Sequence, residues 1–217
     1  VVLSAGVDVQ HDRLAVIIRA WGAGEESWLV YWGEIHGTTM IPEKGAWEDL
    51  DKLLDQDFLC QGEYKAKIRA VSIDSSDGQT NDAVYSYVRA RRQKGYMAVK
   101  GSSVNDDSKE IFTTPKVSVD LNGRYKATRF GVKPFIVVTS RAKDLSLGVD
   151  ANGVRVNLTG DGPGRLLCYM NVRPDYFDQL TSEVKAPIGR GLKRVWQKKS
   201  GVRNEALDCE VYALHAA

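Results

Sequence analysis

The sequence has few of the residues that mark several common classes of protein. Its 217 residues include only three cysteines and three histidines, namely Cys60, Cys168, Cys209, His11, His36 and His215. Neither set has the spacing of zinc ligands, and three scattered cysteines do not make a disulfide framework. This cysteine usage is typical of a protein that works in a reducing compartment.

Long apolar runs and nucleotide-binding loops are also absent from the sequence. Without a run of eighteen apolar residues, it predicts no membrane-spanning helix. The chain opens directly on a strand-like pattern with no leader, which we interpret as a fragment of a longer protein. No Gly-x-x-x-x-Gly-Lys-Ser/Thr loop is present, which excludes ATP hydrolysis by that route within this chain.

The net charge of +2 does not by itself indicate a nucleic-acid-binding protein, but the basic residues are unevenly distributed. One group lies at the end of a predicted helix and comprises Arg89, Arg91, Arg92 and Lys94. A second group lies near the C-terminus and comprises Arg190, Lys193, Arg194, Lys198, Lys199 and Arg203. Such groups indicate a charged face, for which a phosphate backbone is one candidate partner and bulk solvent is the alternative.

The apolar pattern predicts one mixed α/β domain that spans residues 1–217. Three strands, at 1–9, 14–21 and 27–35, are separated by polar turns and should form an antiparallel meander. A strand that ends on Asp74, a following helix and a further strand predict a parallel crossover attached to this meander. The remaining predicted elements are helices at 46–58, 80–94, 140–147, 174–183 and 204–217, strands at 67–73, 96–100, 133–139 and 166–170, and a hairpin of 183–188 with 189–197. Residues 101–131 carry no clear pattern, and turns should dominate 148–164.

Three aspartates interrupt or end otherwise apolar elements. Asp8 lies within the first strand, Asp74 ends the fourth, and Asp208 lies in the last helix. Buried carboxylates are costly, and several that converge raise one another's pKa unless cations neutralise them. Oxygen ligands favour Mg²⁺ or Mn²⁺ over zinc. If the meander and the crossover share one sheet, these three side chains can form a divalent-metal site.

Each aspartate also has an ordinary structural interpretation. Asp8 could pair with a buried basic residue, Asp74 could cap the next helix, and Asp208 could face solvent. Asp77 competes with Asp74 as a ligand, although a role as helix cap explains it well. Glu205, one turn before Asp208, is a possible further ligand, whereas Glu210 should point to the opposite side of the helix.

Several motifs together resemble one known protein family. They are Gly6-Val7-Asp8-Val9-Gln10 with Asp12-Arg13-Leu14, then Ile73-Asp74-Ser75 with Thr80 and Val84-Tyr85, and finally Asn204-Glu205-Ala206-Leu207-Asp208-Cys209 with Val211-Tyr212-Ala213. Lys100-Gly101, Tyr176-Phe177 and the run Gln179-Leu180-Thr181-Ser182-Glu183 keep the same order and spacing. The whole chain resembles the C-terminal nuclease half of the large terminase subunit of lambda-type tailed phages. It departs from that pattern directly after Asp74, where Ser75-Ser76-Asp77 leaves the ligand set open.

The resemblance implies an RNase H-like fold and an endonuclease that cuts concatemeric double-stranded DNA with two Mg²⁺ or Mn²⁺ ions. It implies Asp8, Asp74 and Asp208 as catalytic metal ligands, and the local pattern adds Asp77 and Glu205 as further candidate ligands. Its further implied partners are an ATPase domain of the same full-length chain, a terminase small subunit and a portal protein, in the host cell cytoplasm. Candidate DNA contacts are Arg89, Arg91, Arg92, Lys100, Lys193, Arg194, Lys198, Lys199 and Arg203. The alternatives are an RNase H-like resolvase or transposase, which would use the same carboxylates, and a non-catalytic module that binds DNA or the portal.

Overall fold

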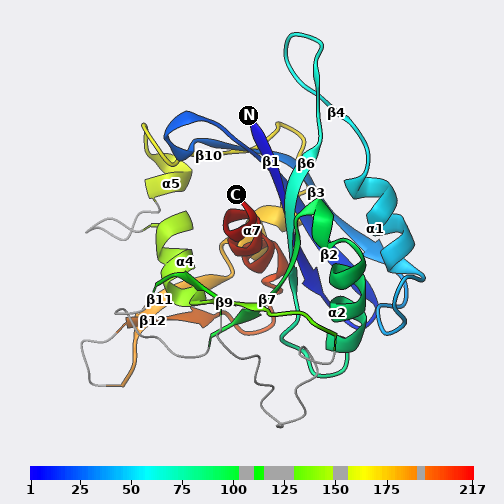
Figure 1. The fold of residues 1–217 in the computed structure, drawn as a ribbon. Coiled ribbons are helices and arrows are strands. Elements are labelled where there is room, and N and C mark those ends of the chain that lie inside the picture. The colour runs from blue at the N-terminus through cyan, green and yellow to red at the C-terminus, as the bar shows by residue number, and fades with distance from the viewer. Residues whose placement is uncertain (103–109, 115–129, 149–155, 190–193) are drawn as a thin grey trace.

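A computed structural model describes residues 1–102, 110–114, 130–148, 156–189 and 194–217. Within these residues, the centre of the molecule is an eight-stranded mixed sheet with the order β10-β3-β2-β1-β6-β7-β9-β8 (Figure 1). Its strands are β1 (Val2–Val9), β2 (Arg13–Trp21), β3 (Ser27–His36), β6 (Ile68–Asp74), β7 (Tyr96–Gly101), β8 (Phe112–Thr113), β9 (Phe135–Val137) and β10 (Leu166–Leu167).

Strand directions divide the sheet into two parts. Strands β1, β2 and β3 pair antiparallel as a meander, whereas β6 pairs parallel to β1, β7 to β6, and β9 to β7. The predicted meander and crossover are therefore confirmed. The mixed α/β architecture, which was predicted together with the RNase H-like fold, is also confirmed.

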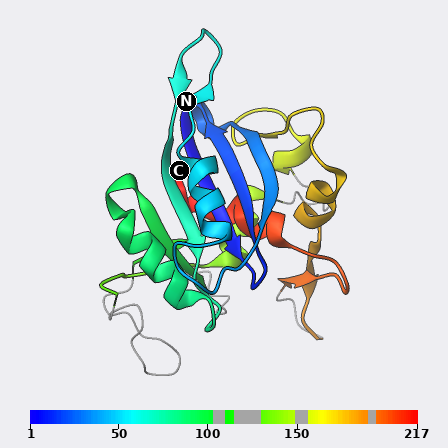
Figure 2. The ribbon, with the colours of Figure 1, turned by 90° about the vertical axis from the view of Figure 1, so that its right-hand side faces the viewer.

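Helices cover both faces of the sheet (Figures 1 and 2). Helices α1 (Ala46–Leu54) and α2 (Asn81–Ala90) pack on one face, and α7 (Glu205–Ala216) packs on the other with α4 (Thr139–Ser146) and α6 (Pro174–Leu180). The smaller elements are η1 (Ala23–Glu25), η2 (Arg92–Lys94), α5 (Val156–Thr159), and two hairpins formed by β4 (Phe58–Leu59) with β5 (Lys65–Ala66) and by β11 (Glu183–Pro187) with β12 (Arg194–Lys198). No helix among the described residues is both long enough and apolar enough to cross a membrane.

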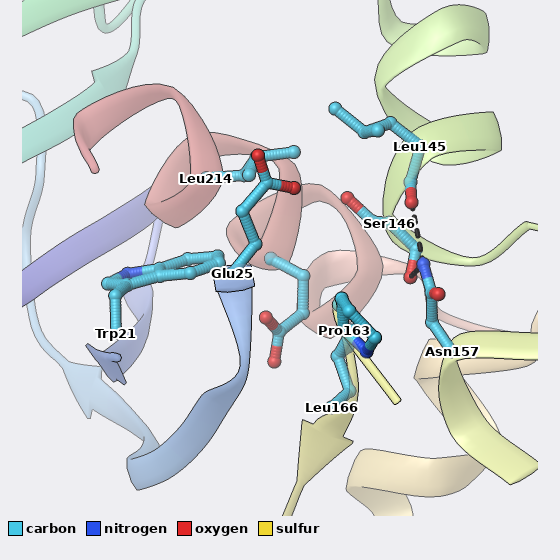
Figure 3. Close-up of a pocket in the computed structure, with 10 residues that line it drawn as sticks. Trp21, Glu25, Leu145, Ser146, Asn157, Pro163, Leu166 and Leu214 are labelled. Atoms are coloured by element: carbon cyan, nitrogen blue, oxygen red, sulfur yellow. Dashed lines mark hydrogen bonds between the residues drawn. The ribbon is translucent and has the colours of Figure 1, made fainter. Parts of the chain in front are cut away.

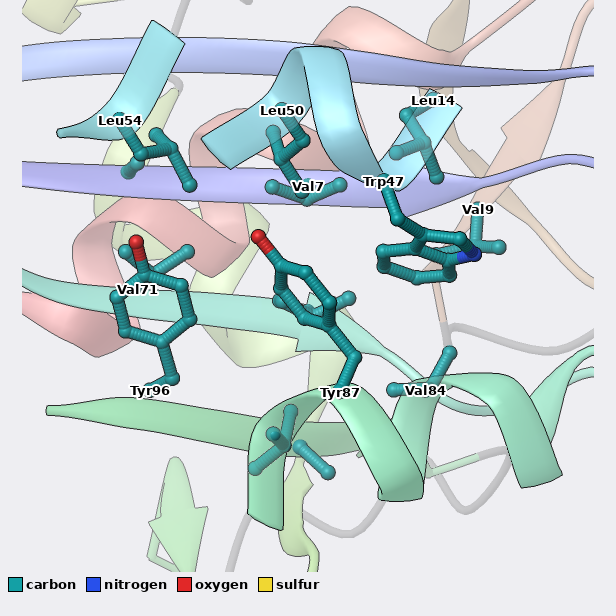
Figure 4. Packing of buried hydrophobic residues seen from close by; sticks show 14 of the residues in the cluster. Val7, Val9, Leu14, Trp47, Leu50, Leu54, Val71, Val84, Tyr87 and Tyr96 are labelled. Atoms are coloured by element: carbon teal, nitrogen blue, oxygen red, sulfur yellow. The ribbon is translucent and has the colours of Figure 1, made fainter. Parts of the chain in front are cut away.

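The alternation of side chains along β1 determines which residues meet α7. Successive side chains of a strand point to opposite faces. Ala5, Val7 and Val9 enter the core formed with α1 and α2, where Trp47, Leu50 and Tyr87 pack beside Val7 and Val9 (Figure 4). The side chains between them point to α7, and Ser4 Oγ donates a hydrogen bond to the carbonyl of Ala213 at 2.7 Å. Asp8 therefore lies on the α7 face.

Gly6 allows α7 to lie directly against β1. A Cβ atom at Gly6 would lie 2.0 Å from the carbonyl oxygen of Cys209 and 2.5 Å from the backbone nitrogen of Ala213.

We therefore expect Gly6→Ala to lower the free energy of unfolding by about 1–3 kcal/mol, because the helix must move away from the strand. Urea denaturation would measure this, with Gly78→Ala as the control, since no atom lies within 4 Å of a Cβ at Gly78. Equal unfolding midpoints for the two variants would contradict the expectation.

Element ends differ from the sequence-based expectation at several places. The helix predicted to reach residue 58 ends at Leu54, and Phe58 instead begins β4 and packs against the core. The helix predicted to reach residue 94 ends at Ala90; a 3₁₀ turn follows and closes on Gly95, whose φ of 79° is left-handed as expected of a helix C-cap. The strands predicted at 133–139 and 166–170 are shorter, and β8 and α5 were not predicted.

Candidate active site

Asp8 and Asp74 lie side by side at the carboxyl ends of two parallel strands. The register pairs Val7 with Ile73, so the next residues, Asp8 and Asp74, occupy neighbouring positions at the ends of β1 and β6. Ile73 enters the core with α1 and α2, which leaves Asp74, like Asp8, on the α7 face. Both residues are buried, with 6% and 8% of their surface exposed.

Asp208 approaches this pair from the first turn of α7. Burial raises the pKa of Asp8 well above its ordinary value, and the negative charges of Asp74 and Asp208 raise it further. Burial also raises the pKa of Asp74 to about 6, and the charge of Asp208 contributes to this increase. The structure thus brings the three predicted aspartates within electrostatic reach of one another.

The Asp8–Asp74 pair is held by neutral hydrogen-bond donors. Gln10 Nε2 donates to Asp8 Oδ2 at 2.7 Å. Ser76 donates to Asp74 Oδ1 from its backbone nitrogen at 3.1 Å and from its Oγ at 2.7 Å, and Tyr212 donates a further hydrogen bond to Asp74. In the part of the chain that the structure describes, no lysine, arginine or histidine forms an ion pair with Asp8 or Asp74. Two adjacent buried carboxylates without a basic partner favour the uptake of a cation.

Asp208 lies in a different environment, which sequence reasoning did not predict. Lys143 Nζ from α4 lies 3.1 Å from Asp208 Oδ1 and 2.7 Å from Glu183 Oε1. Asn204 Nδ2 donates to Asp208 Oδ2 at 2.8 Å and to Glu183 Oε1 at 3.1 Å. Nothing in the local spacing of the sequence links residue 143 with residues 183 and 208, because the contacts are made only by the packing of α4, β11 and α7.

The two additional candidate ligands have other partners. Asp77 Oδ2 accepts hydrogen bonds from the backbone nitrogen and the Oγ1 of Thr80, both at 3.1 Å, and lies 3.2 Å from His11 Nε2. These are the contacts of a residue that caps the turn before α2. Glu205 forms ion pairs with Arg13 and Arg203. Burial raises the pKa of Glu205, but hydrogen bonds from these two arginines outweigh that effect and hold the pKa below its ordinary value. Neither carboxylate needs an added cation in this arrangement.

The donor chemistry of the cluster fits a hard divalent cation, although the side chains are not grouped around one point. Among the described residues, no three His, Cys, Asp or Glu side chains stand in a group that could hold a metal ion. Both oxygens of Asp208 are engaged, by Lys143 and by Asn204. Asp8 and Asp74, in contrast, present buried carboxylate oxygens without a basic partner, which is the donor set that Mg²⁺ and Mn²⁺ prefer. The residues present therefore fit such an ion at the Asp8–Asp74 pair.

The first basic group lies at the far edge of the sheet from Asp74. Helix α2 follows β6 and leads into β7, which is parallel to β6, so its last turn lies near the strands' amino ends. Arg89 and Arg92 are exposed there. Arg91 pairs with Glu43 and Asp51, and its guanidinium lies 3.7 Å from the ring centroid of Tyr87. Arg91 is thus engaged within the protein.

Part of the second basic group adjoins Asp208. Lys198 Nζ donates to Asn204 Oδ1 at 2.8 Å, and Lys199 Nζ donates to the carbonyl of Thr181 at 3.0 Å. Arg203 pairs with Glu34 and Glu205, and Arg194 donates to the carbonyl of Lys185 at 2.9 Å. Lys193 and Arg190 lie outside the described residues.

Lys100 lies at the same sheet edge as Asp74. It occupies the position in β7 that follows Val99, which pairs with Asp74. The backbone nitrogen of the next residue, Gly101, donates to Ser76 Oγ at 3.2 Å. This contact joins the end of β7 to the serine that holds Asp74.

A separate cavity of about 190 Å³ borders α7 at residues other than the aspartates. Trp21, Ser146, Leu166 and Leu214 surround it (Figure 3). None of Asp8, Asp74 and Asp208 lines it. The carboxylate cluster is therefore not part of this cavity.

Comparison with known proteins gives one match over the whole chain. The family model described as "Terminase large subunit gpA, endonuclease domain" matches residues 1–217. The chain is also 28% identical, over 221 residues, to the terminase large subunit of Escherichia phage lambda. That alignment covers 99% of this chain and 32% of the phage protein, so the chain spans about a third of the length of this relative.

Among solved structures, partial likenesses are found to RuvC of Thermus thermophilus. One is RuvC in complex with a Holliday junction substrate, with 16% identity and a TM-score of 0.31 over 46% of this chain and 64% of that one. Another RuvC structure has 17% identity and a TM-score of 0.30 over 45% and 60%. TM-scores at this level do not by themselves establish a shared fold.

Proposed function

Because this chain belongs to the family of terminase large subunit gpA endonuclease domains, we propose that it cuts double-stranded DNA by metal-dependent hydrolysis of phosphodiester bonds. The observation that carries this proposal is the pair of buried carboxylates, Asp8 and Asp74, on the α7 face. They have no basic partner among the described residues and lie within electrostatic reach of Asp208. Such a cluster is stable only if protons or cations neutralise it.

Asp8, Asp74 and Asp208 are the proposed ligands of two Mg²⁺ or Mn²⁺ ions. Asp8 lies between the other two in this assignment, with Asp74 on one ion and Asp208 on the other. When bound, the cations would lower the pKa of water and stabilise the leaving oxygen of the phosphodiester. The protein's own contribution is to orient the carboxylates, through Gln10 on Asp8 and Ser76 on Asp74. Asp77 and Glu205 are weaker candidates because Thr80, His11 and two arginines already engage them.

The basic residues beside Asp208 would hold the DNA backbone. Lys198, Lys199 and Arg203 adjoin the cluster, and Lys100 lies at the same edge of the sheet. Arg194 lies farther away, at the other end of the β11–β12 hairpin. Contacts to phosphates position a duplex without reading its sequence, so binding should weaken steeply with salt. Arg89 and Arg92 would contact DNA only at a distance from the cut, and Arg91 has acidic partners of its own. Lys193 remains a further candidate of the same group.

The family and the lambda relative support a wider role in DNA packaging. In this proposal the chain is the cutting part of a phage packaging enzyme that acts on concatemeric DNA in the host cytoplasm. Its motor would be an ATPase domain of the same full-length protein. A terminase small subunit would select the cut site and a portal protein would receive the DNA, since phosphate contacts alone confer no sequence specificity.

The test is the cutting of supercoiled plasmid in Mg²⁺ or Mn²⁺, with EDTA as the blank. We expect the wild-type chain to nick or linearise the plasmid, and Asp8→Ala and Asp208→Ala to act roughly a thousandfold more slowly. Asp161→Ala is the matched control, because the Asp161 side chain is fully exposed. Equal rates for wild type, Asp8→Ala and Asp208→Ala would refute the assignment.

Other outcomes of the same assay would identify the alternative functions. Strand transfer, or preference for a four-way junction, would indicate a resolvase or a transposase. DNA binding that persists without cutting, and without stabilisation by Mn²⁺, would indicate a binding module.

A further inference from the structure

Lys143 is a buried lysine that contacts two carboxylates from different elements. Its side chain is 8% exposed, and that of Glu183 is 7% exposed. Lys143 Nζ lies 2.7 Å from Glu183 Oε1 and 3.1 Å from Asp208 Oδ1. A lysine is rarely buried unless it is paired, so this position is a specific feature of the fold.

Asn204 bridges the same two carboxylates. Its Nδ2 donates to Glu183 Oε1 at 3.1 Å and to Asp208 Oδ2 at 2.8 Å. Both oxygens of Asp208 thus have a donor, one from Lys143 and one from Asn204. These contacts fix the orientation of Asp208 on the first turn of α7.

The charges divide the carboxylate cluster into two halves. The half formed by Asp208 and Glu183 contains two negative charges and one fixed positive charge, that of Lys143. The half formed by Asp8 and Asp74 contains two carboxylates whose side-chain partners are the neutral Gln10, Ser76 and Tyr212. Among the described residues the second half contains no cation of its own, so its neutralisation depends on protons or an added cation.

We propose that Lys143 is a positioning residue of the nuclease site and serves as the permanent cation of its Asp208–Glu183 half. It holds Asp208 in place before any metal binds, and it limits how strongly this half attracts a divalent ion. The proposal rests on the proposed function, because it treats Asp208 as part of the metal site.

Three variants of this network make the proposal testable by their opposite effects on Mn²⁺ binding. Lys143→Met removes the positive charge, Glu183→Gln removes a negative charge, and the double variant removes both. We expect Lys143→Met to bind Mn²⁺ roughly tenfold more tightly than wild type, Glu183→Gln roughly tenfold more weakly, and the double variant about as tightly as wild type. The EPR signal of free Mn²⁺ during titration measures these affinities without reference to cutting.

Thermal unfolding in EDTA gives a second, metal-free readout. Lys143→Met should lower Tm by roughly 10 °C, because it leaves two buried carboxylates without their cation. Adding Glu183→Gln should restore most of that loss. Lys185→Met is the matched control, because Lys185 Nζ pairs at 2.7 Å with Asp144, the neighbour of Lys143 on α4, rather than with Asp208. We expect it to leave the Mn²⁺ affinity unchanged.

A purely structural lysine would lower Tm but would not move Mn²⁺ affinity in opposite directions for Lys143→Met and Glu183→Gln. Equal affinities across the three variants would therefore overturn the proposal. If Lys143→Met does not fold in EDTA, the Mn²⁺ affinities of wild type, Glu183→Gln and the double variant test the proposal. Glu183→Gln should still bind Mn²⁺ more weakly than the other two. A wild-type chain that neither binds Mn²⁺ nor cuts plasmid would refute the proposed function instead, while the order of the metal-free Tm values would still report on Lys143.

Discussion

In EDTA at pH 8, Asp74→Asn should raise the Tm of this domain by roughly 5 to 10 °C, although it should slow DNA cutting roughly a thousandfold. Burial raises the pKa of Asp74 to about 6, from an ordinary value of 3.8. This increase corresponds to about 3 kcal/mol by which the folded state disfavours the ionised form. Asparagine removes that cost and keeps an oxygen that can accept the hydrogen bonds of Ser76. The residue that we propose as a metal ligand is thus one that destabilises the metal-free fold.

The sign of the pH dependence follows from the direction of the pKa shift. Because the pKa of Asp74 is higher in the folded state, the folded chain binds more protons than the unfolded chain between about pH 4 and pH 6. The stability contributed by Asp74 therefore falls as pH rises through this window, and the cost is complete above about pH 6. The gain from Asp74→Asn should be largest at pH 8, should fall to about half near pH 5 and should nearly vanish below about pH 4.

The titration of His215 overlaps this range and has the opposite effect. Burial lowers the pKa of His215 to about 4, so the unfolded chain takes up a proton first as pH falls below about 6.5, and stability decreases. This contribution is common to wild type and variant. The quantity to compare is therefore the difference in Tm between Asp74→Asn and wild type at each pH, measured by differential scanning fluorimetry.

Mn²⁺ should reverse the order of stability. A ligand that binds only the folded state raises Tm, and wild type retains the full set of carboxylates while Asp74→Asn does not. Asp161→Asn, at a fully exposed side chain, should show neither the gain in EDTA nor the loss in Mn²⁺. An Asp74→Asn variant that is less stable than wild type in EDTA at pH 8 would contradict this account.

The positions of Asp8 and Asp74 could be predicted because they depend on short-range pattern. The two-residue period of a strand places Asp8 on the face opposite Val7 and Val9. The strand–helix–strand unit places β7 beside β6, and the aspartates at the ends of β1 and β6 become neighbours because the meander and this unit share one sheet, which was the condition of the prediction. The position of Asp208 depended on the motif around it. Glu210 was expected to point away from Asp208, and it does lie elsewhere, in an ion pair with Arg19.

Lys143, Glu183 and Arg19 could not be identified in the same way. Their oppositely charged partners lie 40 to 191 residues away in the sequence, and no local period connects them. Arg19 even falls within a run of buried apolar residues in β2, where a charged side chain gives no indication of its partner. The shortest strands were missed or overextended for a related reason, since two residues, as in β8 and β10, are too few to establish an alternation.

Arg19→Met should be the most destabilising substitution in the core, with a loss of about 3–5 kcal/mol in the free energy of unfolding. Arg19 is fully buried, and its Nε and Nη2 each donate to Glu210 at 2.7 Å. Tyr176 OH donates to the same carboxylate at 2.6 Å. Removing the guanidinium would leave Glu210 on α7 as a buried charge without its cation, and α7 is the helix that carries Asp208.

A double-mutant cycle separates the cost of that stranded charge from the loss of packing. Glu210→Gln in the Arg19→Met background removes the charge and keeps an acceptor for Tyr176, so it should recover more than half of the lost free energy in urea denaturation. Lys52→Met is the surface control, because the pair of Lys52 with Asp49 at 2.6 Å is exposed and screened by solvent, so its loss should change stability little. If Arg19→Met lost no more stability than Lys52→Met, the buried Arg19–Glu210 pair would not be what stabilises the packing of α7 against β2. If the double variant recovered nothing, the cost would arise from packing around Arg19, since the charge of Glu210 would already have been removed.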